Sequence, residues 1–223
     1  HASIVAEMAR TLDLPIVSVD YRLAPEHPWP AASDDAEAAA RWVASGPAEL
    51  GRAVTSIALA GDSAGGQMSA VAAVELRDRP AAVPVIAQLL IYPAADLRVD
   101  YPSLDAFAEG YLLTKRGMDW FSECYAADVA HPRASPMANE TLAGLPPAVI
   151  VTASLDPIRD QGRAYAAALI GAGVPVVFRE AAGNIHGFIT LRRAIPSAQG
   201  DVAGMLAAFK DVLVEAEANR VMV

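Results

Sequence analysis

Cysteine is almost absent from this sequence, because Cys124 is the single one among 223 residues. A lone cysteine cannot form a disulfide within the chain, so packing of the core has to hold the fold together. This usage fits a reducing compartment, and we expect a cytoplasmic location. The length is sufficient for one domain, spanning residues 1–223, with a sizeable core.

Long uncharged apolar runs and clusters of basic residues are also absent. Although 54% of the residues are hydrophobic, no stretch reaches the roughly 18 apolar residues that a membrane helix requires. The formal net charge is −9, and an acidic chain without a basic patch argues against nucleic acid as a partner. No signal peptide is visible either. We therefore expect neither a membrane span nor a nucleic-acid partner.

Short apolar runs alternate with longer segments of helical periodicity. The runs predict strands, and several are continuously apolar, as strands covered on both faces are: 15–21, 56–61, 85–93, 148–154 and 174–180. The periodic segments predict helices over 3–12, 34–45, 64–78, 115–127, 160–171 and 199–218. This alternation predicts an α/β fold, with a mostly parallel central sheet flanked by helices.

Residues 94–147 interrupt the alternation with a stretch rich in proline, aspartate and aromatic residues. We expect one helix within it, capped by Thr114, with Trp120, Phe121 and Tyr125 packed inward. A long insertion between two strands is often a lid or a pocket wall. An ordinary surface insertion is an equally good interpretation.

The sequence Gly-Asp-Ser-Ala-Gly-Gly follows an apolar strand and precedes a helix. This is the setting of the G-x-S-x-G nucleophile elbow, a sharp turn that lifts a serine hydroxyl above the edge of a sheet. Ser63 is therefore the candidate nucleophile. We expect any side chain at Gly61 or Gly65 to collide with the neighbouring strand or helix. The N–H of Ala64, at the helix N-terminus, is a candidate oxyanion donor. A glycine-rich turn that binds phosphate is the alternative.

A serine hydroxyl is a poor nucleophile and needs a base, which in turn needs a carboxylate to orient it. Of the four histidines, only His186 follows the last predicted strand, and Gly183 and Gly187 would allow a tight loop around it. Asp156 falls directly after the fourth predicted strand, and Asp160 is its rival, one helical turn further on. The order Ser, Asp, His is that of α/β-hydrolases.

Five motifs together resemble the hormone-sensitive-lipase family of bacterial esterases: YRLAPEHPWPAA (21–32), GDSAGG (61–66), IYPAAD (91–96), DPIRD (156–160) and HGF (186–188). The resemblance implies an α/β-hydrolase fold and hydrolysis of small carboxylic esters with short to medium acyl chains, without cofactor or metal. It also implies that Ser63 is the nucleophile, Asp156 the acid partner and His186 the base.

Two other functions stay open at this point. The same three residue types serve amidases and peptidases, because all of these enzymes transfer an acyl group. A non-catalytic protein that binds a ligand on the same fold is the other alternative.

Members of this family also carry a His-Gly-Gly-Gly motif whose glycine amides complete the oxyanion hole. The resemblance places that motif upstream of the first predicted helix, and the sequence contains nothing like it. We therefore expect residues 1–223 to be an N-terminally incomplete part of a longer protein. The strand before the motif would lie between the strands at 15–21 and 56–61. A full-length mass near 23.3 kDa would contradict this expectation.

The last predicted strand, 174–180, would leave one edge of the sheet open. Exposed apolar edges invite pairing with another chain, and relatives in the family often dimerise there. We therefore expect a homodimer through this edge, with an edge covered within a monomer as the alternative.

Overall fold

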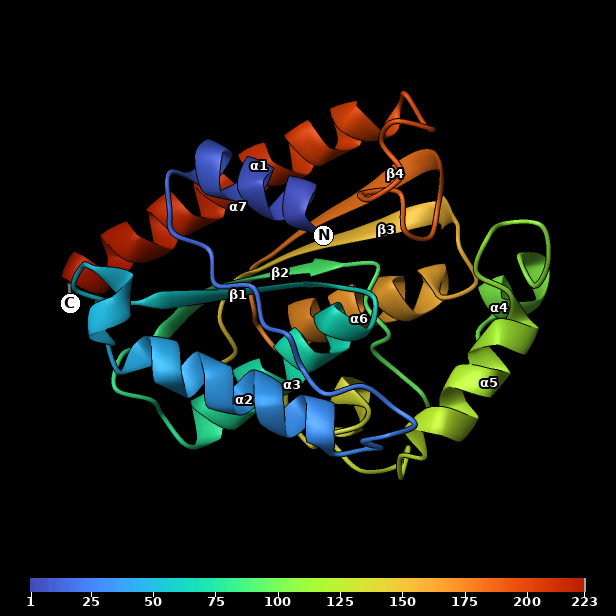
Figure 1. The fold of residues 1–223 in the computed structure, drawn as a ribbon, viewed down its shortest axis with the longest axis horizontal. Helices are drawn as coiled ribbons and strands as arrows, with labels where there is room; N and C mark the ends of the chain where they lie inside the picture. Colours follow the sequence, from blue (N-terminus) through green and yellow to red (C-terminus); the bar gives the residue numbers. More distant parts are fainter. Residues whose placement is uncertain (223) are drawn as a thin grey trace.

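A computed structural model describes residues 1–222, and at its centre lies a sheet of four parallel strands (Figure 1). The strands are β1 (Ile57–Asp62), β2 (Val85–Ile91), β3 (Ala148–Leu155) and β4 (Val176–Ile185), and they lie in this order across the sheet. Because all four run in the same direction, their carboxyl ends lie at one edge of the sheet.

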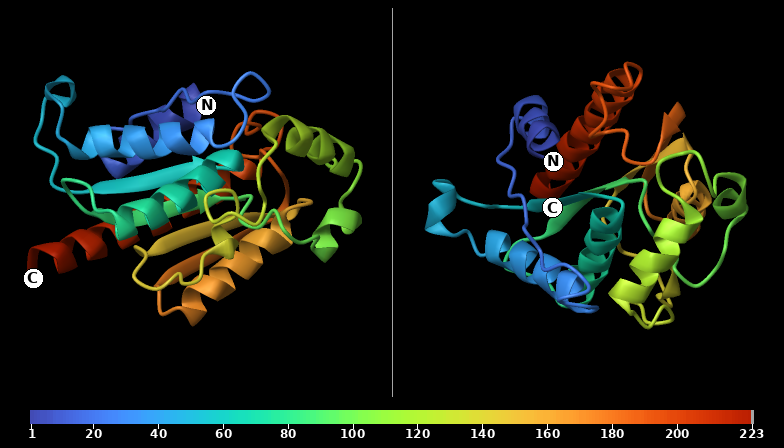
Figure 2. Two further views of the ribbon diagram at one scale, coloured as in Figure 1. Left: turned by 90° about the horizontal axis from the view of Figure 1, so that it is seen from below. Right: turned by 45° about the vertical axis from the view of Figure 1, so that its right-hand side comes forward.

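Helices cover both faces of this sheet (Figures 1 and 2). One face carries α1 (Ala2–Leu12) and α7 (Ala198–Met222), and the other carries α2 (Ala31–Ala44), α3 (Ala64–Asp78) and α6 (Arg159–Gly171). The connections contain α4 (Pro102–Ala106), α5 (Lys115–Tyr125) and two 3₁₀ turns, Ala48–Leu50 and Pro136–Ala138. The α/β class expected from the sequence is confirmed. Among residues 1–222, no helix is long and apolar enough to cross a membrane.

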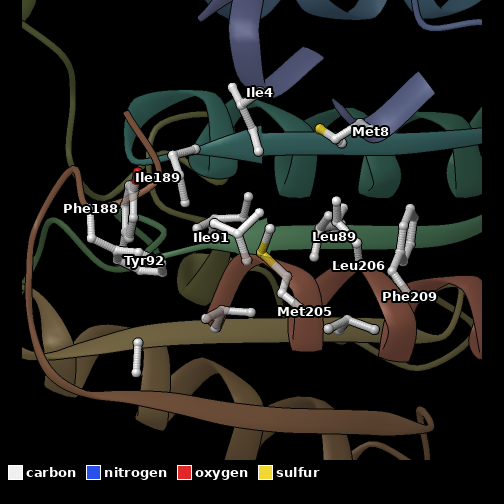
Figure 3. Close-up of a cluster of buried hydrophobic side chains, with 14 of the residues drawn as sticks. Ile4, Met8, Leu89, Ile91, Tyr92, Phe188, Ile189, Met205, Leu206 and Phe209 are labelled. Carbon is white, nitrogen blue, oxygen red and sulfur yellow. The ribbon is translucent and has the colours of Figure 1, made fainter. Parts of the chain in front are cut away.

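Successive residues of β2 and β3 contribute to two separate cores. Leu89 and Val149 pack toward α1 and α7, where Met205 also lies (Figure 3). Leu90 and Ile150 pack toward α3 and α6 instead. All five of these side chains are fully buried. Because both faces of these strands are covered, their sequences contain mainly apolar runs instead of an alternation of apolar and polar residues.

The predicted strand at 15–21 is wrong. In the structure this segment is extended but forms no strand pairing among residues 1–222. Its side chains Val17 and Val19, which would share one face of a strand, are 39% and 40% exposed, so that face is not covered as expected. Ile16 is partly buried and packs against the core. A strand needs a hydrogen-bonded neighbour, and an apolar run cannot report whether that neighbour is present. The other predicted elements agree closely. The largest difference is in β4, which continues to Ile185 because Leu155 of β3 pairs with it.

Residues 94–147 hold two α-helices instead of the one expected, since α4 precedes α5. The predicted cap of α5 is confirmed, because Gly117 N donates a hydrogen bond to Thr114 Oγ1 at 3.1 Å. The predicted inward packing is wrong for Trp120 and Phe121, which are 57% and 53% exposed. Tyr125 is half-buried. Helix α5 lies to the side of the sheet (Figure 1), and none of its residues is fully buried.

An ion-pair network joins the inserted segment to α2 and α3. Arg133 Nη1 lies 2.8 Å from Glu37 Oε2 and 3.0 Å from Glu75 Oε1. Glu37 also accepts a hydrogen bond from Arg41 Nε at 2.9 Å. Burial alone would raise the pKa of Glu37, but the hydrogen bonds from Arg133 and Arg41 outweigh it and hold this pKa below its ordinary value of 4.5.

We expect Glu37→Gln to weaken the acid dependence of stability. A carboxylate with a lowered pKa in the folded state stabilises the fold above its ordinary pKa, and that contribution disappears as the pH falls through the folded-state value. The free energy of unfolding of the wild-type chain should therefore fall more steeply below pH 4.5 than that of the variant. Denaturant titrations over a pH series measure this, with the exposed Glu49→Gln as control. Parallel profiles for wild type and Glu37→Gln would contradict the network's role.

Candidate active site

Each strand of the sheet is followed directly by one polar side chain. Ser63 follows β1, Tyr92 follows β2, Asp156 follows β3 and His186 follows β4. Parallel pairing holds these four carboxyl ends at one edge of the sheet. Residues that are far apart in the sequence therefore meet at a single place, as is common for sites in open α/β sheets.

Three of these side chains form a continuous hydrogen-bonded line. His186 Nε2 lies 2.8 Å from Ser63 Oγ, and His186 Nδ1 lies 2.7 Å from Asp156 Oδ2. The side chain of Asp156 is fully buried, and that of His186 is only 11% exposed. With its proton on Nδ1, the imidazole donates to Asp156, so Nε2 can accept the hydroxyl hydrogen of Ser63.

The serine stands in a strained turn between β1 and α3. Its φ is 56° and its ψ is −119°, a conformation that residues other than glycine rarely adopt. Helix α3 begins at the next residue, Ala64. The N–H of Ala64 therefore belongs to a first helical turn whose amides have no acceptor within the helix, and the helix dipole favours negative charge there.

The glycines of this turn differ in what they allow. A Cβ on Gly61 would lie 2.1 Å from the carbonyl oxygen of Gly65, so only glycine fits at position 61. The collision expected at Gly65 itself is wrong, because no atom outside its chain neighbours and the backbone of its own helix lies within 4 Å of the place a Cβ would take there. The next residue, Gly66, has less room than Gly65, because a Cβ on it would lie 3.0 Å from Pro93 Cβ. Helix α3 approaches the chain after β2 through Gly66.

The loops that carry the acid and the histidine are held by local contacts. Asp156 Oδ1 accepts a hydrogen bond from Ile158 N at 2.9 Å, which fixes the carboxylate in its turn. Asp160, the rival acid, points elsewhere: its Oδ1 lies 2.8 Å from Arg159 Nε. Gly183 and Gly187 both have positive φ, 73° and 81°. Gly187 lies in the loop beside His186 as expected, whereas Gly183 lies within β4, where the pairing with β3 is irregular.

Two further residues beside His186 were not found from the sequence. The ring of Tyr92 packs on the imidazole with 4.5 Å between ring centroids. Its hydroxyl donates to Asp62 Oδ2 at 3.2 Å. Burial raises the pKa of Asp62, and burial together with the nearby Asp62 raises that of Tyr92. The position of Tyr92, directly after a buried strand, was the signal that could have marked it.

The described part of the chain offers no cluster of side chains suited to binding a metal ion. No group of three or more histidine, cysteine, aspartate or glutamate side chains among residues 1–222 is arranged to hold a metal ion.

Comparison with known proteins identifies the family of this chain. Residues 1–190 match the alpha/beta hydrolase fold family. The chain belongs to that family. Carboxylic ester hydrolase LipN of Mycobacterium tuberculosis is 42% identical over 200 residues, which cover 86% of this chain and 53% of LipN. Esterase LipI of the same organism is 42% identical over 217 residues, covering 96% of this chain and 68% of LipI.

Solved structures give the same result. An esterase of Pyrobaculum calidifontis superposes with a TM-score of 0.89 at 40% identity, covering 96% of this chain and 72% of the esterase. The α/β-hydrolase fold and the resemblance to esterases of the hormone-sensitive-lipase family are thereby confirmed. The chain nevertheless spans only about half the length of LipN, 53%.

The two elbow glycines should respond differently to alanine. Gly61→Ala forces a Cβ into the Gly65 carbonyl, and such overpacking typically costs about 1–3 kcal/mol. Gly65→Ala meets open space within a helix, where alanine is normally favoured over glycine. Denaturant unfolding should therefore show a clear loss of stability for Gly61→Ala and none for Gly65→Ala. Equal losses in both variants would contradict the geometry of the turn.

Proposed function

We propose that this chain forms the catalytic part of a carboxylic ester hydrolase that cleaves short- to medium-chain acyl esters through an acyl-enzyme on Ser63. The observation that carries the proposal is the hydrogen-bonded line from Ser63 through His186 to Asp156. The similarity to LipN, a carboxylic ester hydrolase, and to LipI, an esterase, supports esters as the substrate class.

In the proposed reaction, Ser63 Oγ forms a bond to the ester carbonyl carbon while His186 Nε2 takes its proton. Asp156 stabilises the imidazolium, and the N–H of Ala64 donates to the oxyanion. Collapse of this intermediate breaks the bond to the alcohol, which leaves with the proton from His186. Water then attacks the acyl-enzyme by the same route, which releases the acid and restores the serine.

The oxyanion hole determines how fast this reaction can run. The family resemblance assigns further donors to a His-Gly-Gly-Gly segment that residues 1–223 do not contain. Loss of one such donor typically lowers turnover by about 10²–10³. Activity should therefore be measured on the protein that carries this chain as well as on residues 1–223 alone, and we expect the latter to be slow.

Replacement of the nucleophile should abolish ester cleavage. In the protein that carries this chain, Ser63→Ala should lower kcat for p-nitrophenyl esters by on the order of 10⁶, as loss of the nucleophile does in serine proteases. The exposed Ser45→Ala is the matched control and should retain activity. Undiminished cleavage by Ser63→Ala would overturn the proposal.

The same assay separates the alternatives. Esters of graded acyl length, tested beside an anilide, should show turnover of the shorter esters and little of the anilide. A preference for the anilide would favour an amidase or peptidase. No turnover of either substrate would favour a protein that only binds its ligand.

We also propose that residues 94–147 supply a wall of the substrate pocket through the loop between α4 and α5. Leu112, in the loop between α4 and α5, has its Cδ2 3.8 Å from the place a Cβ would take on Gly187, next to His186. Leu112 is itself 66% exposed, so an apolar surface stands beside the imidazole.

The single cysteine, Cys124, supports a cytoplasmic location.

The open edge of β4 is proposed as a homodimer contact. Among the described strands, β4 pairs only with β3, and its Val177 and Phe178 are 38% and 40% exposed. Sedimentation velocity should show a dimer that Phe178→Lys dissociates, because a buried unpaired charge opposes association. A monomer at all accessible concentrations would contradict this proposal.

A further inference from the structure

Two helices in separate parts of the chain cap each other. Ser103, in the first turn of α4, donates its backbone N–H to Asp160 Oδ2 at 3.0 Å. In return, Asp160 in the first turn of α6 donates its backbone N–H to Ser103 Oγ at 3.2 Å. Each residue thus accepts, with its side chain, an N–H that the other helix leaves without an acceptor of its own.

Neither helix has a side-chain cap from its own segment. The residue before α4 is Tyr101 and the residue before α6 is Ile158, and neither makes a capping hydrogen bond with its side chain. The capping that usually comes from the neighbouring residue here comes from the other helix. Ser103 is fully buried, so water cannot replace its hydroxyl if that hydroxyl is removed.

The same hydroxyl also reaches the loop that carries Asp156. Ser103 Oγ donates to the carbonyl oxygen of Pro157 at 2.8 Å. Pro157 directly follows Asp156, whose Oδ2 lies 2.7 Å from His186 Nδ1. One buried hydroxyl therefore joins the inserted segment to the peptide next to the triad carboxylate.

The side chain of Asp160 is held in place by two arginine side chains. Asp160 Oδ1 lies 2.8 Å from Arg159 Nε and 3.2 Å from Arg163 Nη1. Arg159 in turn donates to the carbonyl oxygen of Ser154 at 3.2 Å and stacks over Phe107, 5.0 Å from its ring centroid. The segment around α4 thus contacts the turn after β3 and the start of α6 through two residues, Ser103 and Phe107.

We propose that Ser103 and Asp160 are positioning residues that set the place of Asp156, so that the segment around α4 orients the triad from outside it. This inference rests on the proposed function. The carboxylate of Asp156 makes its hydrogen bonds to His186 and to Ile158 N, and none to the inserted segment. The inserted segment acts on it through the backbone of Pro157.

The consequence for catalysis depends on how much displacement the hydrogen-bonded line of Ser63, His186 and Asp156 tolerates. Ser103→Ala removes the partner of the half-buried N–H of Asp160 and of the buried carbonyl oxygen of Pro157. Such groups shift to find new partners. A misplacement of about 1 Å can cost up to 10²-fold in rate. We expect kcat for a short ester to fall about 10-fold, with KM unchanged, because the substrate does not touch these residues.

A second buried serine of the same segment provides the matched control. Ser135 is fully buried and its Oγ accepts a hydrogen bond from Leu97 N at 3.0 Å, but it does not contact the turn after β3. Ser135→Ala should lower the unfolding midpoint about as much as Ser103→Ala and leave kcat unchanged. Equal kcat in the two variants would overturn the inference.

Proton NMR gives a readout that does not depend on turnover. A proton shared between His186 Nδ1 and Asp156 Oδ2 resonates far downfield of other signals. It should be present in the wild-type protein and in Ser135→Ala, and weakened or shifted in Ser103→Ala. A signal unchanged in Ser103→Ala overturns this inference alone. A wild-type protein without the signal overturns the proposed function as well.

Asp160, the other residue of the reciprocal cap, offers an independent pair of variants in case Ser103→Ala does not fold. Asp160→Asn retains a carbonyl oxygen that can accept the N–H of Ser103, whereas Asp160→Ala removes it. Asp160→Asn should therefore keep more of the kcat and more of the downfield signal than Asp160→Ala. Equal losses in these two variants would overturn the inference.

Discussion

Parallel pairing of four strands is the constraint on which the site depends. Asp62 of β1 pairs with Ile91 of β2, and Leu155 of β3 pairs with Ile185 of β4. The residue that follows each of these four positions contributes to the site. A shift of one residue in any of these registers would turn the corresponding side chain toward the opposite face. The apolar residues that fill both cores therefore also fix the geometry of the reactive line, since they determine the register.

A buried carboxylate requires compensation, and the surroundings of His186 provide it. Asp156 has no exposure to water and is held by one backbone N–H and by the imidazole. An isolated buried charge is costly, and the hydrogen bonds from Ile158 N and from the imidazole compensate this carboxylate. Asp62, linked through the hydroxyl of Tyr92, adds a second acidic group near the same ring. The site is therefore arranged to stabilise charge that appears on His186 during reaction.

The sequence predicted those parts of the molecule whose cause is local. Strands buried on both faces, such as residues 85–91 and 148–155, leave mainly apolar runs that only Gln88, Thr152 and Ser154 interrupt. The elbow leaves a glycine-serine pattern in which position 61 has room for glycine alone. The segment 15–21 has the same apolar character but no partner strand among the described residues, and pairing is not encoded locally. Helical periodicity in residues 115–125 identified a helix but not how much of it packs, so the exposure of Trp120 was not foreseen.

Contacts between distant segments left no trace that a single sequence could reveal. Tyr92 lies on His186, and Ser103 caps α6, only because the folded chain brings separate strands and loops together. Among the site residues, Ser63, Asp156 and His186 could be proposed because each stands where a strand ends and because their chemistry is complementary. Of the residues that support them, Tyr92 could have been marked by its position directly after a buried strand. Ser103 has ordinary sequence surroundings, so only the folded structure identifies it.

Covalent labelling tests the central claim most directly. A fluorophosphonate reacts with a serine only where a base activates the hydroxyl, so digestion and mass spectrometry of the labelled protein locate the activated residue. The account predicts one label per chain on the peptide that contains Ser63, and a rate of labelling that collapses in His186→Ala. A label on another residue, or equally fast labelling of Ser63 without the imidazole, would contradict it.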